Sequence, residues 1–136
     1  MENNKIKIIF IIHTLTAGGA QRVMSYLAQN LSKEKFDVTF VSIGYKKDNV
    51  YDLNSINQVY FNQKRVIYSV IPIAKYLRLN KPDIVFSSII HVNTLMAYIS
   101  IFFPRIKFML RVANVLSVLK NYSNQSKIYF PKIKRF

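Results

Sequence analysis

The stretch KIKIIFIIHTLTAGGAQRVMSYLAQNLSKEKFDVTFVSIG, residues 5–44, decides the fold. It begins with a nearly continuous apolar run, Lys5 to His13, which predicts a strand buried on both faces, as in a parallel sheet covered by helices. A turn with two glycines follows. Apolar residues then recur at helical spacing from Ala20 to Leu31, and Asp37 to Ile43 is a second β-rich run. Strand, turn, helix and strand in this order predict a βαβ unit.

The same alternation continues along the chain. The elements predicted are a polar loop over 45–55, a strand over 56–61, a helix over 66–79, a strand over 83–87, a loop over 88–93, a helix over 94–103 and a strand over 105–112. Pro72 lies inside the second helix, which therefore either kinks there or begins near Ile71. We predict an α/β fold, a Rossmann-like open parallel sheet with helices on both faces, over residues 1–119. A basic tail over 120–136, the start of a helical stretch, follows it.

The charge balance is strongly basic and unevenly distributed. Among 136 residues, 20 are Lys or Arg and 6 are Asp or Glu, giving a formal net charge of +14, and the last acid is Asp83. Such a surface attracts anionic lipid, nucleic acid or phosphorylated substrates. A codon bias toward Lys, Asn and Ile explains the excess equally well. Cysteine is absent, which excludes disulfides and Cys-based zinc sites and suits a reducing cytosol.

The turn over residues 14–19 is the first candidate site. It follows the first strand at its carboxyl end, where ligands bind in open α/β sheets. Gly18 and Gly19 let a ligand approach the backbone, and the free N–H groups of the next helix favour phosphate. Alternatively, the glycines serve only the geometry of the turn. A dinucleotide site and a P-loop are excluded, because the turn lacks the G-x-G-x-x-G spacing, no acid ends the second strand and no G-K-[ST] follows.

Polar residues after two later strands point to the same edge of the sheet. His91 and Asn93 lie in the loop predicted after the fourth strand, and Arg111 and Asn114 lie near the end of the fifth. His91 is suited to donate a hydrogen bond or act as general base toward a sugar hydroxyl or a phosphate, or it is a solvent-facing loop histidine. Arg111 is the best placed to meet an anion, although an arginine at a strand end is often only solvated.

No pair of carboxylates with acid/base spacing occurs in a plausible site of the sequence. Asp83 begins a strand, which places it at the opposite edge of the sheet. The sequence therefore offers no pair of acids for hydrolysis and no metal site built from His or carboxylate ligands.

Three segments together resemble the N-terminal domain of the family 4 glycosyltransferases, which are retaining enzymes of the GT-B type. Residues 5–44 resemble the first strand, G-G-A-E-R type turn and helix of that family. KPDIVFSSIIHVNTLMAYIS (81–100) resembles its K-P-D-[IV]-V strand with a His-bearing loop, and KFMLRVAN (107–114) resembles the next strand. The resemblance runs from about Lys5 to Asn114. Gln21 stands where the family usually has glutamate.

The resemblance implies a two-domain enzyme whose N-terminal domain holds the acceptor and whose C-terminal domain holds a nucleotide-sugar. Gly18 and Gly19 would face the donor diphosphate, and His91 is the implied catalytic residue. The implied contacts to acceptor or phosphate are Thr16, Gln21, Arg22, Asn93, Arg111 and Asn114. We expect no cofactor and no metal, because helix termini and basic side chains can stabilise the leaving diphosphate.

The family's C-terminal domain has no counterpart in these 136 residues. We therefore expect a truncated or split enzyme that does not transfer sugar on its own. Its expected role is the assembly of a surface polysaccharide or a glycolipid, and its expected location is the cytoplasm. Expected partners are a nucleotide-sugar, a glycan or lipid-linked acceptor, a C-terminal half or a second copy, and the anionic inner face of the cell membrane. Residues 94–103 with Arg105 and Lys107 are the candidate membrane contact, or simply a buried crossover helix.

Two other classes of function are weighed against this one. The first is a non-catalytic remnant or binding module with the same fold. The second is nucleic-acid binding through the basic tail, which neither a recognition helix nor an RNA-binding aromatic signature supports.

Overall fold

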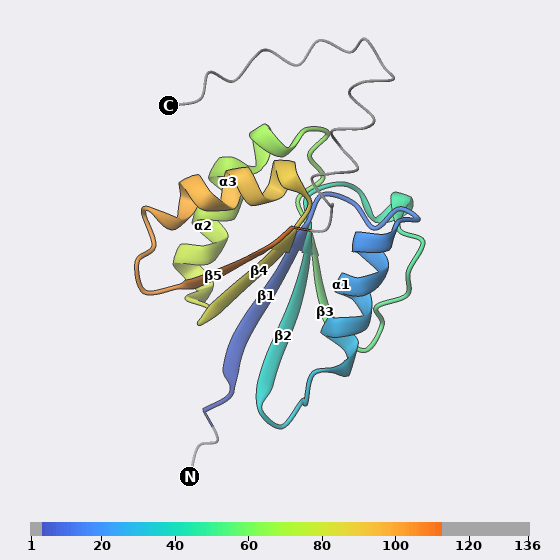
Figure 1. The fold of residues 1–136 in the computed structure, drawn as a ribbon, viewed down its shortest axis with the longest axis horizontal. Coiled ribbons are helices and arrows are strands. Elements are labelled where there is room, and N and C mark those ends of the chain that lie inside the picture. The colour runs from blue at the N-terminus through green and yellow to red at the C-terminus, as the bar shows by residue number, and fades with distance from the viewer. Residues whose placement is uncertain (1–3, 113–136) are drawn as a thin grey trace.

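Five parallel strands form one sheet in the order β3-β2-β1-β4-β5 (Figure 1). The computed structural model describes residues 4–112. The strands are β1 (Ile6–Ile12), β2 (Phe36–Ser42), β3 (Asn57–Tyr60), β4 (Ile84–Ser88) and β5 (Lys107–Arg111). The helices are α1 (Gly19–Asn30), α2 (Val70–Asn80) and α3 (Ile90–Ser100), with short 3₁₀ turns at Lys46–Asp48 and Val66–Ser69. The predicted fold class is confirmed.

The middle of the sheet is its most buried part, because β1 has a strand on either side. Residues 8–12 of β1 are all buried. Phe10 lies in register with Phe40 of β2 and Phe86 of β4, and its ring centroid is 6.2 Å from the first ring and 5.2 Å from the second. A run of large apolar residues without polar alternation suits a strand that is covered on both faces.

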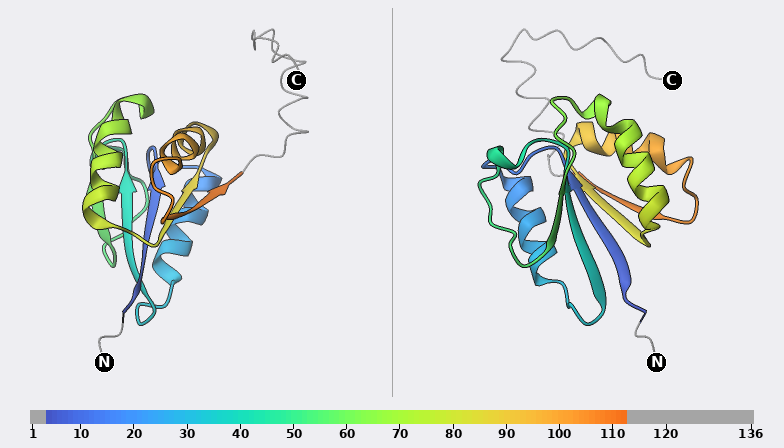
Figure 2. Two further views of the ribbon diagram at one scale, coloured as in Figure 1. Left: turned by 90° about the vertical axis from the view of Figure 1, so that its left-hand side faces the viewer. Right: turned by 180° about the vertical axis from the view of Figure 1, so that it is seen from behind.

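Helices cover both faces of the sheet, α1 on one face and α2 with α3 on the other (Figure 2). Each face has its own core. The α1 core contains Ile8, Phe10, Ile12, Leu15, Met24, Ala28, Phe40 and Leu53. The core beneath α2 and α3 contains Ile9, Ile11, Val41, Ile43, Ile73, Leu77, Val85, Val92, Leu95, Met96 and Ile99. Alternate residues of β1 thus serve opposite layers, as the period of a strand requires.

The predicted starts of two helices differ in how well they agree with the structure. The helix containing Pro72 begins at Val70, so the proline lies in its first turn, where its missing N–H has no intrahelical partner to lose. The loop predicted over 88–93 is wrong, because α3 already begins at Ile90. Ile89 reverses the chain directly after β4 with a φ of 83°, a turn that the sequence pattern does not reveal because no glycine marks it.

The strand order reverses between β1 and β4, and this reversal positions the candidate site. Starting from β1, the chain moves toward β2 and β3 on one side and then crosses to β4 and β5 on the other. In open α/β sheets ligands bind outside the carboxyl ends of the strands at such a switch point, because the connections leave it toward opposite faces. The connection from β1 to α1 and the connection from β4 to α3 flank it.

Candidate functional site

The glycine turn, residues 14–19, enters α1 with extended backbone rather than with a left-handed residue. Gly18 is the N-cap, with φ −170° and ψ 158°. A Cβ at this position would collide with the amide end of the Gln21 side chain, which folds back over the turn, whereas a Cβ on Gly19 would meet open space. A Cβ on Gly18 would therefore have to displace only the flexible end of Gln21, and Gly19 leaves the helix entrance open.

The first turn of α1 offers backbone donors at this edge. Its first intrahelical bond joins Arg22 N to Gly18 O at 3.0 Å. The amides of Gly19, Ala20 and Gln21 precede that bond and have no carbonyl within the helix to reach. The helix has no side-chain cap and no acid in its first turn. These N–H groups and the helix dipole favour an anion here.

The segment after β2 braces the glycine turn from the side. Val50 N donates to Leu15 O at 2.9 Å, and Tyr51 Oη lies 3.3 Å from Gly18 O, to which it donates. Leu15 and Leu53 are both buried beneath these bonds. The sequence predicts only a polar loop here. The apolar residues at intervals within that loop are the available signal that it packs against something.

Gly44 lies where the end of β2 packs closely against the end of β1. Its N–H donates to His13 O at 2.7 Å, and a Cβ would lie 2.5 Å from Thr14 Cγ2 and 3.1 Å from His13 O. A side chain cannot fit there without displacing backbone. This glycine is thus a packing requirement of the site's floor, whereas the sequence marks it only as the end of a strand.

The connection from β4 to α3 is strained and internally hydrogen-bonded. Ile89, the N-cap of α3, has φ 83° and ψ 130°, a conformation that costs a β-branched residue about 1–3 kcal/mol. Buried Asn93 accepts a hydrogen bond from Ser87 Oγ at 2.8 Å, and its Nδ2 donates to Arg111 O at 2.8 Å. One amide therefore joins the ends of β4 and β5 to the first turn of α3.

His91 is exposed in that first turn, as is Ile90 before it. It precedes the first intrahelical bond of α3, Asn93 N to Ile89 O at 2.9 Å, so its backbone N–H is also free of a helical acceptor. On the neighbouring strand, Nη1 of half-buried Arg111 lies 3.5 Å from Ser88 Oγ. An imidazole, a guanidinium and free helix amides thus occur together on the β4–β5 side of the switch point.

The predicted site residues fall into three groups. The first group lies around the entrance of α1 and contains Gly18, Gly19, Thr16, Gln21 and Arg22. The side chains of Thr16 and Arg22 are exposed. His91, Asn93 and Arg111 lie on the other side of the switch point, but Asn93 is buried and both ends of its amide are already bonded within the chain. Asn114 lies outside the described residues, as do the predicted domain boundary and the basic tail.

A tyrosine at the end of β3 adds a titratable group to this edge. Tyr60 Oη receives a hydrogen bond from Asn49 Nδ2 at 2.6 Å and donates to Gln58 Oε1. Burial raises the pKa of Tyr60, and the Asn49 hydrogen bond opposes part of that rise. Burial likewise raises the pKa of Tyr76 in α2, with a smaller contribution from nearby Asp37. Both hydroxyls stay neutral at physiological pH.

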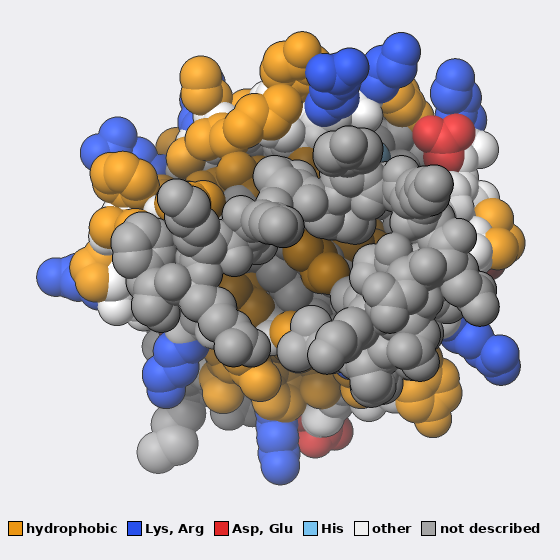
Figure 3. All heavy atoms as spheres, turned by 45° about the horizontal axis from the view of Figure 1, so that its top comes forward, with side chains coloured by type: hydrophobic (Ala, Val, Ile, Leu, Met, Phe, Trp, Pro, Cys, Tyr) orange, Lys and Arg blue, Asp and Glu red, His pale blue; other side chains and the backbone are white. Residues whose placement is uncertain are grey.

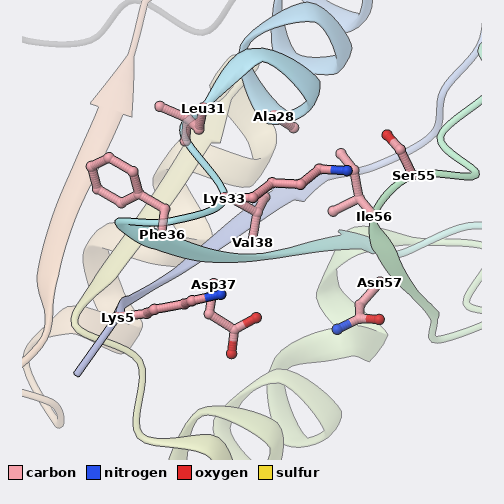
Figure 4. A pocket seen from close by; sticks show the side chains of 10 residues that line it. All are labelled: Lys5, Ala28, Leu31, Lys33, Phe36, Asp37, Val38, Ser55, Ile56 and Asn57. Atoms are coloured by element: carbon pink, nitrogen blue, oxygen red, sulfur yellow. The ribbon is translucent and has the colours of Figure 1, made fainter. Parts of the chain in front are cut away.

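Hollows occur in the described part of the chain at a distance from this edge. One of about 200 Å³ lies where α1 ends and β2 begins, among Lys5, Lys33, Phe36 and Asp37 (Figure 4). It is at the opposite edge of the sheet from the glycine turn and His91. Within residues 4–112 no group of His, Asp or Glu side chains is arranged to hold a metal ion.

Seen toward the carboxyl edge, the surface carries Lys and Arg side chains around its rim and few acids (Figure 3). Hydrophobic side chains gather in the same view on the left, where α2 and α3 lie. In the described part of the chain, no helix has the length and hydropathy needed to cross a bilayer.

Comparison with known proteins identifies the fold. No family model matches the sequence, and no curated protein matches it. The structure is similar to the crystal structure of a glycosyltransferase from Rickettsia africae ESF-5, with a TM-score of 0.59 and 22% sequence identity. The similarity covers 89% of this chain and 34% of that chain, so this chain spans about a third of that protein's length. The chain therefore has a glycosyltransferase-like α/β fold.

Proposed function

We propose that this chain is the acceptor-side, N-terminal domain of a retaining, GT-B type glycosyltransferase of family 4. The enzyme would transfer a sugar from a nucleotide-sugar in the assembly of a bacterial surface polysaccharide or glycolipid, on the cytoplasmic side of the membrane. One observation carries the proposal. Two helices with free first-turn amides, α1 and α3, begin on either side of the switch point, and His91 is exposed on the second.

The two helix entrances suit different parts of the reaction. The open backbone at Gly18 and Gly19 admits a diphosphate to the amides of α1, which would stabilise the charge that develops on the leaving group. Arg22 is the next residue of α1 after these amides, and its side chain is exposed. Such fixed donors compensate anionic charge without a metal ion, because they are oriented before the reaction begins.

The β4–α3 side suits the sugar or the acceptor. His91 would hold a hydroxyl of the transferred sugar or the acceptor by a hydrogen bond. Arg111 would attract a phosphate of the acceptor. Asn93 acts in this proposal by holding His91 and Arg111 in place through its bonds to Ser87 and to the Arg111 carbonyl, rather than by touching the substrate.

The proposal is tested by calorimetric titration of the full chain with inorganic pyrophosphate. With neither sugar nor acceptor present, pyrophosphate should reach from the α1 amides to the β4–α3 side. We therefore expect saturable binding that His91→Ala and Arg111→Gln each weaken about tenfold, the loss of one charge-assisted hydrogen bond. Lys33→Gln, a charge change at the opposite edge, is the matched control and should leave the affinity unchanged. Equal weakening by all three variants, or no saturable binding, would reject the proposed anion site.

A transfer assay separates the enzyme domain from a non-catalytic module. Residues 1–136 alone should move no labelled sugar from nucleotide-sugars, because the proposed reaction also requires a donor-binding domain. Addition of a donor domain should restore transfer, and His91→Ala should abolish the restored activity. A chain that binds pyrophosphate but supports no transfer with any donor domain would instead be the non-catalytic module.

A further inference from the structure

The outer face of α3 carries no charge, although it is exposed. The helix sequence, IHVNTLMAYIS, contains no Asp, Glu, Lys or Arg, and its inward residues fill the core beneath it. The residues exposed on the outward side are Ile90, His91, Thr94, Ala97, Tyr98, Ile101 and Phe102, counting the turn that ends the helix. They recur at intervals of three and four and so form one stripe, which we call the α3 outer stripe.

The apolar members of this stripe protrude into solvent. Tyr98 is 67% exposed, Ile101 73% and Phe102 80%. A helix that is apolar on all sides is normally buried on all sides, and the core accounts for only one side of α3. The two interpretations of this segment, a crossover helix or a surface contact, are therefore compatible, because the inner side of α3 packs on the sheet while no part of residues 4–112 covers its outer side.

Cations surround the far end of the stripe. Phe102 shares a hollow of about 480 Å³ with Arg78, Lys81 and Arg105, where the end of α2 faces the turn between α3 and β5. Asp83 also lines this hollow, but its carboxylate already accepts the N–H of Lys7 at 2.8 Å. No Asp or Glu follows Asp83 in the sequence. The combination is a protruding apolar edge with a basic flank.

We propose that the α3 outer stripe docks on the interface of an anionic lipid bilayer, with Ile101 and Phe102 inserted among the headgroups and Arg78, Lys81 and Arg105 on lipid phosphates. Protruding side chains suit a fluid surface, which closes around them. A second copy is disfavoured, because a symmetric contact would oppose the same cations.

Docking through the α3 outer stripe would also orient the candidate site relative to the membrane. The stripe begins at Ile90, next to His91, and runs the length of α3, 11 residues or about 16 Å. A bilayer along the stripe therefore passes beside the carboxyl edge of the sheet as well as the basic hollow at the other end. Membrane docking requires no donor or acceptor, so its test stands apart from the test of the transferase proposal.

A single tryptophan gives a direct readout, because the chain has none of its own. Phe102→Trp should emit at shorter wavelength when the full chain meets vesicles of phosphatidylcholine with phosphatidylglycerol, and brominated acyl chains should quench it. Tyr26→Trp is the matched control, since Tyr26 is 66% exposed on α1, across the sheet. Its emission should not change. Unchanged emission from the vesicle-bound Phe102→Trp variant, or equal quenching of the two variants, would overturn the proposal.

Vesicle co-sedimentation measures the contributions of the two halves of the surface. Ile101→Ser with Phe102→Ser should lower the partition coefficient about tenfold, and Arg78→Gln with Arg105→Gln should lower it by a similar factor on anionic vesicles only. Tyr26→Ser should change it less than about twofold. All these side chains are exposed, so the variants should fold. Failure of the unaltered chain to bind anionic vesicles would refute the proposed membrane contact. So would a partition coefficient that neither of the two double substitutions changes.

Discussion

Two strand-to-helix connections lie at the switch point, and they are stabilised in different ways. The connection from β1 to α1 uses two glycines, an unstrained backbone and braces supplied by another loop. The connection from β4 to α3 uses no glycine, holds Ile89 at a positive φ and braces itself through Asn93. The first is relaxed and open, whereas the second is strained and tied to the core.

The difference shows where the stability of the site resides. A strained residue persists only where its surroundings over-determine it, and at Ile89 the surroundings are the Asn93 hydrogen bonds and the core packing of α3. The glycine turn depends instead on space, which Gly44 provides beside Thr14 and the His13 carbonyl. Changes to buried polar groups should therefore damage the second connection, and changes in volume should damage the first.

The largest effect is expected at Asn93. Asn93→Ala would leave the Ser87 hydroxyl and the Arg111 carbonyl without their partner in a buried place, and we expect the free energy of unfolding to fall by about 2–4 kcal/mol. Urea denaturation measures the loss. Asn30→Ala, on the exposed end of α1, is the control and should cost less than about 1 kcal/mol. A loss at Asn93 no greater than at Asn30 would show that the hydrogen-bonded brace does not stabilise the connection.

Gly44→Ala should be next in size. The new methyl would press on Thr14 Cγ2 and on the His13 carbonyl, so we expect a loss of about 1–3 kcal/mol. Gly19→Ala places the same methyl in open space at the start of a helix and should be neutral or slightly stabilising. Thermal unfolding of the two variants side by side measures the difference, and equal melting temperatures would contradict the packing explanation.

Ile89→Gly should cost little despite removing a half-buried side chain. The strain of about 1–3 kcal/mol that glycine relieves offsets the lost packing. Ile56→Gly is the matched change, because Ile56 is also half-buried against the α1 core and its φ is not positive. That variant should lose at least about 1 kcal/mol more than Ile89→Gly. Equal losses in urea denaturation would show that Ile89 stores no strain.

The smallest effect is expected from alkaline pH. The pKa of Tyr60 is raised by burial, so the fold favours the neutral phenol. Its contribution to stability is complete below the ordinary value near 10 and is lost as the pH rises from there toward the raised value. Because Tyr60 is bonded to Asn49 in the segment that braces the glycine turn, the amide of Val50, which donates to Leu15 O, should be the first to lose its protection from exchange. Tyr60→Phe should remove this dependence, and earlier opening at Asn93 would contradict it.

The relaxed connection can be predicted from the sequence, and so can most of the fold. Isoleucine-rich runs, helical spacing and a glycine pair are local signals, and the predicted strands lie within one or two residues of those observed. Pro72 is compatible with two outcomes in the sequence, and in the structure the helix begins just before it.

The strained connection cannot be predicted in this way, for a physical reason. The positive φ of Ile89 is imposed by tertiary contacts, and no propensity predicts it. The predicted helix consequently begins at Thr94, four residues late, although Val92, Leu95, Met96 and Ile99 already follow the helical period. Asn93 is predicted as a contact to acceptor or phosphate in the loop after the fourth strand, and only the structure shows its two internal hydrogen bonds.

The most direct test of the central claim, that the two connections form one anion-binding crevice, is a nuclear magnetic resonance titration of the ¹⁵N-labelled full chain with inorganic pyrophosphate. We expect the amides of Gly19, Ala20 and His91 to shift together along one binding curve, while that of Lys33 stays in place. Shifts confined to one connection, different curves for the two, or a response centred on the hollow beside Lys33 would contradict the claim.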